Sequence, residues 1–436
     1  MQEQDQRFRG EVIGLAVKSA VVAVVALVAG SVVVHSESNW PGWRGPARSG
    51  LVDGAPWPES LGKEVLVKRW HVDVAEGYPG PIVFEDRVFT VETSDERAEV
   101  VRAFDRESGE LIWARSWEGA MKVPFFAARN GSWVRSTPAT DGKVLLVGGM
   151  REVLVALDLQ TGDERWRIDF VEAFDGQLPS FGFASSPLIV GEAAFVQAGG
   201  GVVKLKVESG EVVWRRRTGG GGMSGGAFSS PILTEVNGKQ QLIVQGREKL
   251  MGIDPKTGER LWDQAVKAFR GMNIVTPVPY KNGFFTTTYG GRSRLWTIER
   301  RGTAIEVGNP WDNKLQGYMC TPVVVGDHAY FHLRNQRAAC VDLATGEIAW
   351  VSDERFGKYW SMVAQGDRIL ALDEQGELIL FKANPEKFEM VDRREVSSSE
   401  TWGHLTVVDG EIYVRELRGL SSWSWKGATE LAQGNR

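Results

Sequence analysis

The sequence predicts an all-β protein, an eight-bladed β-propeller of four-stranded antiparallel blades. A turn motif of the form Asp-x-x-Thr-Gly-Glu-x-x-Trp recurs along the chain and is clearest at Asp342–Trp350. A run of apolar residues that begins with Ser-Pro or Thr-Pro lies upstream of most copies. Repeats of about 40 to 50 residues are typical of propellers and solenoids. Beyond the N-terminal segment no stretch keeps a helical period, so we expect few helices.

Residues 1–36 are expected to form a membrane-targeting segment. Arg7 and Arg9 precede an apolar stretch, residues 12–34, that only Lys18 interrupts with a charge. The stretch is long enough to span a bilayer as an uncleaved transmembrane helix, and its part after Lys18 also has the length of the apolar region of a signal peptide. Cleavage and anchoring both stay open. In either case the basic residues in front direct the rest of the chain outward, so we expect an exported protein, periplasmic or at the cell surface.

Residues 37–63 form an irregular lead-in to the repeats. Its first part, Trp40–Gly50, reads Trp-Pro-Gly-Trp-Arg-Gly-Pro-Ala-Arg-Ser-Gly, and Trp57-Pro58 follows. This composition is too rich in proline and glycine for a helix. We expect the lead-in to drape over the folded domain.

The propeller is expected to occupy residues 64–426, followed by a tail at residues 427–436. Proline is tolerated at the start of a strand but not inside a central strand, so each Ser/Thr-Pro pair marks the first strand of a module. Eight first strands are counted, beginning near Pro81, Thr137, Ser186, Ser230, Thr276, Thr321, Ser361 and His404. The last module offers only three strands of its own. The isolated strand predicted at residues 64–74 is therefore expected to complete that sheet and close the ring.

The repeated motif has a structural explanation. Its copies are Asp105–Trp113, Asp158–Trp166, Asp254–Trp262 and Asp342–Trp350, with a partial copy at Glu208–Trp214. The Asp can close an Asx turn, the Gly accepts positive φ, and the Trp is placed to pack between neighbouring sheets. The modules at residues 274–311 and 359–396 lack the motif but keep four apolar runs. We expect the acidic residues of the motif to belong to turns and to take no part in chemistry.

Composition excludes several classes of protein. The formal net charge of −5 leaves no basic excess for nucleic acid. Cys320 and Cys340, the two cysteines, are predicted on strands roughly 9–10 Å apart and are expected to be buried, unbridged thiols. His328 and His332 would lie ~13 Å apart along a strand, which is too far for a shared metal ion. The glycine-rich stretch at residues 219–226 matches a dinucleotide-binding motif, G-x-G-x-x-G, and a nucleophile-elbow motif, G-x-S-x-G, only by chance, because a strand follows it where both motifs require a helix.

The pairing of Ser/Thr-Pro strand starts with Asp-x-x-Thr-Gly-Glu-x-x-Trp turns resembles the PQQ-like repeat of eight-bladed propellers, over residues 64–426. The lead-in is similar to that of exported PQQ-like repeat proteins of unknown role. The resemblance implies one of two kinds of function. Quinoprotein dehydrogenases of this superfamily bind pyrroloquinoline quinone and calcium, whereas others, such as the outer-membrane β-barrel assembly lipoprotein, are scaffolds. The fold alone does not choose between them.

Two departures speak against the dehydrogenase chemistry. The adjacent cysteine pair of those enzymes is missing, because Cys320 and Cys340 are far apart in the sequence. No matching set of calcium-binding Glu and Asn with a catalytic Asp is found. We therefore expect no catalytic residue and no cofactor, and pyrroloquinoline quinone with calcium only under the alternative function. The lipid-attachment cysteine of the assembly lipoprotein is also missing from the N-terminal segment.

The loops before the first strands are expected to gather on one face, around the central channel. They are rich in aromatic residues and methionine and contain a few cations. The candidate ligand-binding rim consists of Phe126, Trp133, Arg135, Phe183, Met223, Arg270, Tyr318, Trp360 and His404. An apolar rim with cations suits an anionic or extended ligand. The alternative is that these rings only pack between blades.

The sequence thus favours an exported, non-catalytic propeller that acts as a binding or assembly scaffold in the cell envelope. Its expected partners are a protein or a glycan of the envelope, and the membrane if residues 12–34 remain attached; nucleic acid is not expected. One alternative is a quinone-dependent oxidoreductase, and another is a carbohydrate-binding module that uses the aromatic rim.

Overall fold

The computed structural model describes residues 39–128, 131–218 and 225–426. The helices whose bounds fall within these ranges are the single turns α1 (Phe170–Ala173) and η2 (Phe269–Gly271), and no helix of the described residues is long and apolar enough to cross a bilayer. The predicted targeting segment, with its apolar stretch at residues 12–34, and the tail at residues 427–436 lie outside the described residues, as do residues 219–224 of the glycine-rich stretch.

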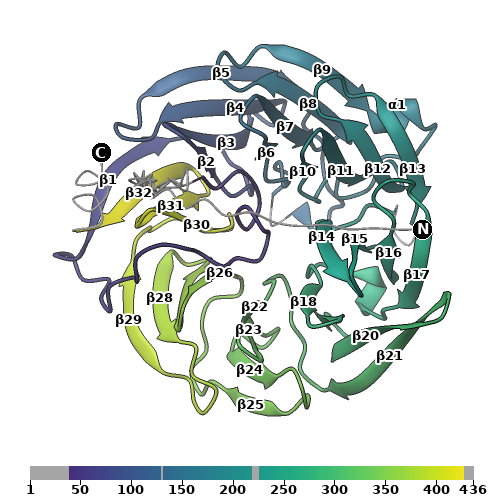
Figure 1. Cartoon of the computed structure of the whole chain (residues 1–436). Helices are drawn as coiled ribbons and strands as arrows, with labels where there is room; N and C mark the ends of the chain where they lie inside the picture. The colour runs from purple at the N-terminus through teal and green to yellow at the C-terminus, as the bar shows by residue number, and fades with distance from the viewer. Residues whose placement is uncertain (1–38, 129–130, 219–224, 427–436) are drawn as a thin grey trace, which may run out of the picture. The chain divides into compact units, whose positions relative to one another are not determined.

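Eight four-stranded antiparallel sheets are arranged in a ring around a central channel, as predicted (Figure 1). The first four blades are formed by β2 (Ile82–Phe84), β3 (Arg87–Ser94), β4 (Ala98–Asp105) and β5 (Leu111–Glu118); β6 (Ala139–Thr140), β7 (Val144–Gly149), β8 (Val153–Asp158) and β9 (Glu164–Asp169); β10 (Leu188–Val190), β11 (Ala193–Ala198), β12 (Gly201–Lys206) and β13 (Val212–Arg217); and β14 (Ile232–Val236), β15 (Lys239–Gln245), β16 (Lys249–Ile253) and β17 (Arg260–Ala265).

The remaining blades follow the same order from the channel outward. They are formed by β18 (Val278–Tyr280), β19 (Gly283–Thr287), β20 (Ser293–Arg301) and β21 (Ala304–Asn313); β22 (Val323–Val325), β23 (His328–His332), β24 (Ala338–Asp342) and β25 (Ile348–Val351); β26 (Trp360–Gln365), β27 (Arg368–Asp373), β28 (Glu377–Lys382) and β29 (Met390–Glu395); and β30 (Thr406–Val408), β31 (Glu411–Glu416), β32 (Gly419–Trp425) and β1 (Leu66–Asp73).

The eighth blade closes the ring in the predicted way. The N-terminal strand β1 pairs antiparallel with β32, so that Leu66 lies opposite Trp425 and Asp73 opposite Gly419. One sheet therefore contains both ends of the propeller. This pairing covers strand edges that an open array would leave free for association.

The repeated turn and its tryptophan have the roles expected of them. The motif aspartates accept hydrogen bonds of 2.7–3.0 Å from the backbone N–H groups two and three residues further on. Five spacer tryptophans pack on the turn glycine of the next blade, and each donates its indole N–H to a carbonyl of that turn. The donor and acceptor residues are Trp70 and Arg106, Trp113 and Leu159, Trp166 and Val207, Trp214 and Pro255, and Trp311 and Leu343.

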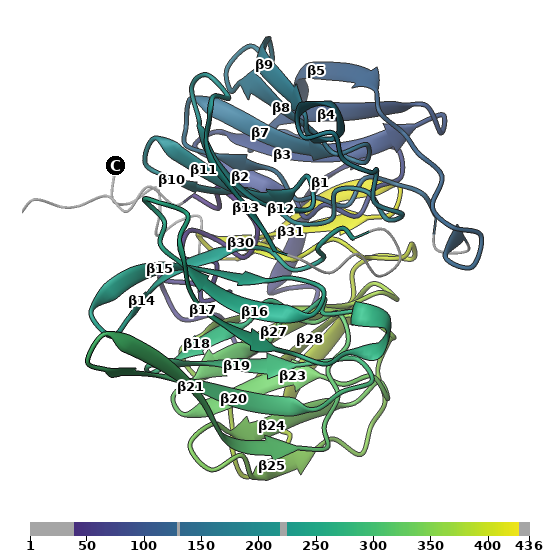
Figure 2. The same cartoon turned by 90° about the vertical axis from the view of Figure 1, so that its right-hand side faces the viewer.

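The fifth blade shows what happens where the motif is missing. Trp262 of the fourth blade therefore lacks a motif turn in the fifth blade as its hydrogen-bond acceptor. Its indole N–H donates instead to Gln241 Oε1 of its own blade, at 2.7 Å, and its ring stacks on Phe284. Trp311 nevertheless serves as a spacer without a motif turn of its own. In the side view the sheets β14–β17 and β18–β21 lie one on the other (Figure 2).

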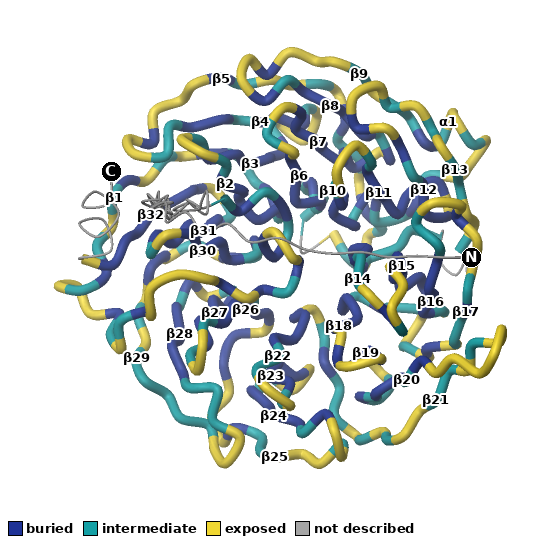
Figure 3. The backbone as a smooth tube through the Cα atoms, in the orientation of Figure 1, coloured by how far each residue is buried: buried dark blue, intermediate teal, exposed yellow. Residues whose placement is uncertain are grey.

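The apolar core lies between neighbouring blades. The second and third strands of each blade are buried, and exposed residues concentrate on the outermost strands and turns (Figure 3). Cys320 and Cys340 are buried free thiols, as expected. Arg215, Arg216 and Arg217 lie on the outermost strand β13, where Arg215 packs over the ring of Phe174.

The lead-in differs from its prediction. It does not drape over the domain but enters it (Figure 1). Trp40 pairs with Val83 of β2, and Gly50 and Val52 bond the backbone of Ala364 in β26, so the intervening residues cross the channel. The later part fills the core, where Trp57 stacks on Trp425 with ring centroids 5.7 Å apart. The tryptophans of the lead-in gain more by burial than an external position allows.

Candidate functional site

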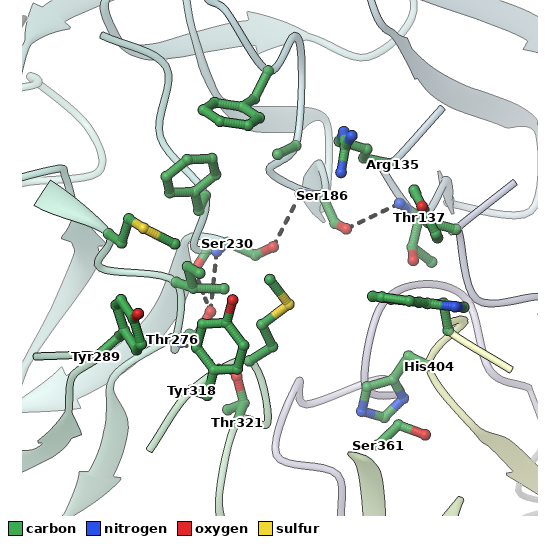
Figure 4. A pocket seen from close by; sticks show the side chains of 18 of the residues that line it. Arg135, Thr137, Ser186, Ser230, Thr276, Tyr289, Tyr318, Thr321, Ser361 and His404 are labelled. Carbon is green, nitrogen blue, oxygen red and sulfur yellow. Dashed lines mark hydrogen bonds between the residues drawn. The ribbon is translucent and has the colours of Figure 1, made fainter. Parts of the chain in front are cut away.

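The loops before the first strands surround a cavity of about 570 Å³ at one mouth of the channel (Figure 4). All eight blades contribute to its wall, because each loop enters its blade at the innermost strand. The aromatic, basic and imidazole side chains of the wall belong to Trp43, Tyr78, Phe126, Arg135, Phe181, Phe228, Arg247, Phe269, Arg270, Tyr289, Tyr318, Trp360, Trp402 and His404.

A ring of hydroxyl groups lies at the inner ends of the blades. In each Ser/Thr-Pro pair the hydroxyl oxygen accepts a hydrogen bond from the backbone N–H of the preceding blade. These bonds run from Gly80 to Thr137, from Thr137 to Ser186, from Ser186 to Ser230, from Ser230 to Thr276 and from Thr276 to Thr321, at 3.0–3.3 Å. The repeat therefore carries a second function besides starting a strand: the small hydroxyl residue links each blade to its neighbour.

The lead-in closes the channel beside this ring. Arg44 donates to the carbonyls of Thr321 at 2.8 Å and Pro322 at 2.7 Å. Arg48 donates to the carbonyls of Ser186 and Pro231. Burial lowers the pKa of Arg44 to about 10 and that of Arg48 to about 9, so both side chains stay charged at neutral pH. Their neighbour Trp43 lines the cavity.

Aromatic rings surround the cavity in two arcs. One arc consists of phenylalanines, in which Phe126 contacts Phe125 and Phe181, and Phe181 contacts Phe228. The longer arc runs through the pairs Phe269–Tyr289, Tyr289–Tyr318, Tyr318–Tyr359, Tyr359–Trp402, Trp402–Tyr78 and Tyr78–Trp133, with ring centroids 4.2–5.5 Å apart. Neighbouring rings of the longer arc are therefore in direct contact, and Tyr318 and Tyr359 are stacked.

The charges in the wall are positive. Arg135 lies over the Tyr78 ring at 5.2 Å, Arg247 over Phe228 at 4.6 Å, and Arg270 over Phe269 at 5.1 Å. Among the described residues that line the cavity there is no Asp or Glu. Burial lowers the pKa of Arg135, which shows that its charge is poorly solvated. The cavity therefore favours an anionic group.

His404 is neutral in this environment. Its imidazole Nδ1 lies 2.8 Å from the carbonyl oxygen of Leu405, and burial together with the charge of Arg44 lowers its pKa to about 3. A neutral ring that donates from Nδ1 leaves Nε2 as an acceptor. The ring of Trp43 meets it edge to face, with centroids 6.0 Å apart.

The structure brings together six of the nine residues predicted for the rim. Phe126, Arg135, Arg270, Tyr318, Trp360 and His404 line the cavity. Trp133 lies just behind, packed on Tyr78. Phe183 is buried in the core between the second and third blades, where Phe170 meets its ring. Met223 lies outside the described residues.

Sequence reasoning missed several lining residues. Trp43 was not expected because the lead-in was placed on the outside. Arg247 and Tyr289 lie in or near the turns between second and third strands, which also reach the mouth. Tyr78 and Phe269 belong to loops that the prediction did include, and their aromatic side chains could have identified them as members of the rim.

The wall does not suit the calcium of quinoprotein dehydrogenases. Calcium takes six to eight oxygen ligands and generally uses carboxylates. Among the described residues the cavity lining offers none, and no group of three His, Cys, Asp or Glu side chains is placed to hold a metal ion. His328 and His332 lie on strand β23, as predicted, at its two ends. The residues present thus do not fit quinone with calcium.

These features define an eight-bladed PQQ-repeat propeller with an aromatic, positively charged cavity at one mouth of its channel. The chain belongs to the family described as outer membrane protein assembly factor BamB, whose model matches residues 96–352. Relatives named as that factor include one from Shewanella oneidensis, 22% identical over 339 residues, covering 73% of this chain and 78% of that protein. Another, from Yersinia pestis, is 21% identical over 412 residues, covering 89% and 85%.

Solved structures share the fold. The crystal structure of BamB from Moraxella catarrhalis has a TM-score of 0.62 at 17% identity and covers 83% of this chain and 100% of that chain. Quinohemoprotein alcohol dehydrogenase from Comamonas testosteroni has a TM-score of 0.59 at 14% identity, covering 89% of this chain and 80% of that one. At such identities both likenesses concern the fold, and an enzyme and an assembly factor share it.

Proposed function

We propose that this protein is a non-catalytic scaffold that binds a protein partner in the cell envelope, in an assembly role like that of its relatives. The observation that carries the proposal is the composition of the mouth: aromatic rings and three arginines, with no carboxylate among the described lining residues. General acid–base and nucleophilic catalysis need a positioned base, and the one imidazole there, His404, is buried without a carboxylate to orient it. The wall suits binding better than chemistry.

The exposed part of the mouth has the character of a protein interface. Phe125 and Phe126 are 90% and 51% exposed, and Phe269 and Met319 stand out on the other side. Aromatic residues and arginine dominate the energy of protein interfaces, and they do so at the buried centre of a contact. An extended segment of a partner that enters the cavity would cover these side chains and meet the arginines below them.

The carbohydrate-binding alternative is less well supported. Sugars stack on the open faces of aromatic rings, whereas the rings of the longer arc lie against one another, as between Tyr359 and Trp402 at 4.2 Å. The quinone alternative meets the difficulty that the wall lacks oxygen ligands for calcium. Titration of the purified protein with pyrroloquinoline quinone and calcium, followed by calorimetry, checks this point: stoichiometric binding would favour the oxidoreductase and overturn the proposal.

Export to the envelope is part of the proposal. The relatives' name, which refers to the outer membrane, and the apolar stretch at residues 12–34 support it. Cell fractionation with an antibody against the propeller tests it. We expect the protein to be found in the envelope fraction. Its release from membranes by a carbonate wash would indicate that the apolar stretch is cleaved, whereas its retention would indicate that the stretch anchors the protein.

The test of the scaffold is site-specific photo-cross-linking in cells of the source organism. A photo-reactive residue placed at Phe126 or Phe269 should give adducts with a protein of the outer-membrane β-barrel assembly machinery or with a barrel under assembly. The matched control is Val213, an exposed apolar residue on the outermost strand β13. Adducts of equal yield at all three positions, or none at the mouth, would contradict the proposal.

A further inference from the structure

One side of the cavity contains polar atoms without partners. Tyr78 Oη, Arg135 Nε, Trp360 Nε1 and His404 Nε2 are buried and have no hydrogen-bond partner among the described residues. All four residues line the cavity and come from adjacent parts of the ring, the seventh, eighth, first and second blades. An unpaired buried polar atom destabilises the fold, because it has lost its hydrogen bonds to water. Four of them in one wall indicate a site prepared for a polar ligand.

The four atoms differ in what they require. The guanidinium Nε–H of Arg135, the indole N–H of Trp360 and the phenol of Tyr78 are donors. Nε2 of His404 is an acceptor, because Nδ1 carries the proton toward Leu405. A matching ligand therefore presents an acceptor group of two or more lone pairs and, elsewhere along its length, an N–H or O–H. Arg135 is held in place from its other end, by Nη2 donating to Gly131 at 3.3 Å.

The charge of the wall selects among acceptor groups. Arg135 is positive and buried in the wall (Figure 4). Arg247 and Arg270 line the same cavity. The described lining contains no Asp or Glu beside these arginines. A carboxylate fits this wall because it accepts several hydrogen bonds and neutralises a buried guanidinium, and charge-assisted bonds are about twice as strong as neutral ones.

We propose that this wall binds the carboxylate of an extended peptide. Arg135 and Tyr78, which lie against each other, donate to the carboxylate. Trp360 and His404, further along the wall, offer a donor and an acceptor to the backbone of the same peptide. The aromatic arcs take up the apolar side chains on either side of the acidic residue. The inference rests on the proposed function and deepens it, since it names the feature of the partner that the mouth recognises.

The experiment uses calorimetry with the full-length protein in detergent and matched synthetic peptides. One pair, acetyl-Gly-Phe-Glu-Phe-Gly-amide and its Gln counterpart, carries or lacks a side-chain carboxylate. A second pair, acetyl-Gly-Phe-Gly-Phe with a free or amidated C-terminus, carries or lacks a main-chain carboxylate. In at least one pair, we expect the peptide that carries the carboxylate to bind at least tenfold more tightly than its neutral counterpart. The pair that shows this difference identifies whether the carboxylate comes from a side chain or from the C-terminus. Equal affinities within both pairs, no binding at all, or inorganic phosphate competing as well as the peptide would overturn the inference.

Two variants of the wall distinguish a loss of peptide binding from a loss of folding. Tyr78→Phe removes only an oxygen that has no partner among the described residues, so it should leave thermal unfolding unchanged while weakening peptide binding several-fold. Arg135→Gln should weaken binding about tenfold or more, as expected for a charge-assisted bond. Arg97→Gln, at an exposed arginine paired with Glu118, is the control and should bind like the unaltered protein. Full affinity in both wall variants would overturn the carboxylate site, while cross-links from Phe126 and Phe269 would still support the scaffold.

Discussion

Arg44 offers the sharpest test of how the lead-in holds the propeller together. Its side chain is 1% exposed, and it joins the lead-in to the sixth blade through the carbonyls of Thr321 and Pro322. A third bond, of 2.5 Å, reaches the carbonyl of Ser49 and keeps the lead-in folded back on itself. The substitution Arg44→Ala removes all three bonds and leaves the two blade carbonyls unpaired.

The size of the effect can be worked out from these contacts. Two unpaired buried carbonyls cost about 2–6 kcal/mol together. Burial disfavours the charge of Arg44, as its lowered pKa indicates, so removing that charge offsets part of this cost. We therefore expect the free energy of unfolding to fall by about 3 kcal/mol. An unfolding entropy of about 2.1 cal/mol/K per residue gives roughly 0.8 kcal/mol/K for a domain of this size, so about 3 kcal/mol corresponds to a Tm about 4 °C lower.

The assay is thermal unfolding followed by near-ultraviolet circular dichroism, combined with limited proteolysis. The control is Arg151→Ala, at an exposed arginine in the turn between β7 and β8. Arg44→Ala should melt earlier than the control, and a protease should cut the lead-in sooner. Identical melting and cleavage in the two variants would refute the idea that the lead-in helps to close the ring.

Three further predictions concern the folded domain. A Cβ at Gly162, where φ is 73°, would lie 2.6 Å from the Trp113 ring, whereas a Cβ at Gly302, where φ is 63°, would meet open space. Gly162→Ala should therefore lower Tm more than Gly302→Ala does. Equal decreases in Tm would contradict the role of Trp113 as a spacer between blades. Burial raises the pKa of Glu152 to about 7, so the folded state binds the extra proton between about pH 4.5 and 7 and loses stability as pH rises through that window. Between about pH 4.5 and 7 the free energy of unfolding of the unaltered protein should therefore fall by about 3 kcal/mol relative to that of Glu152→Gln, as measured by denaturant titration at each pH. A difference between the two proteins that does not change with pH would refute this. Burial raises the pKa of Cys320 to about 11 and of Cys340 to about 12, so neither thiol should react with Ellman's reagent in the native state at pH 8, whereas both should react after unfolding.

The prediction from sequence succeeded where a contact is local or repeated. An Asx turn depends on neighbouring residues, and five spaced tryptophans leave few ways to arrange the blades. Strand starts were predicted to within a few residues because proline marks them: the inner strands begin at the residue directly after Pro138, Pro187, Pro231, Pro277 and Pro322. The shared eighth blade followed from counting strands.

The mouth was predicted only in outline. The loop residues were identified as a group, because the repeat fixes which end of each blade they occupy. Their individual directions were not predictable: Phe183 turns into the core between two blades, while Phe181, two residues earlier, faces the cavity. Such a choice depends on the space left by the neighbouring blade.

By itself, then, the sequence determined the number of blades, their turns and the end of the blades at which the aromatic loops gather, because these follow from short-range chemistry repeated along the chain. The tertiary structure alone decided the course of the lead-in and the grouping of Tyr78, Arg135, Trp360 and His404. Arg44 reaches its carbonyl partners across more than 270 positions of the chain, and no local pattern encodes such a contact. Closing the ring brings these segments together, and the site exists only once the ring has closed.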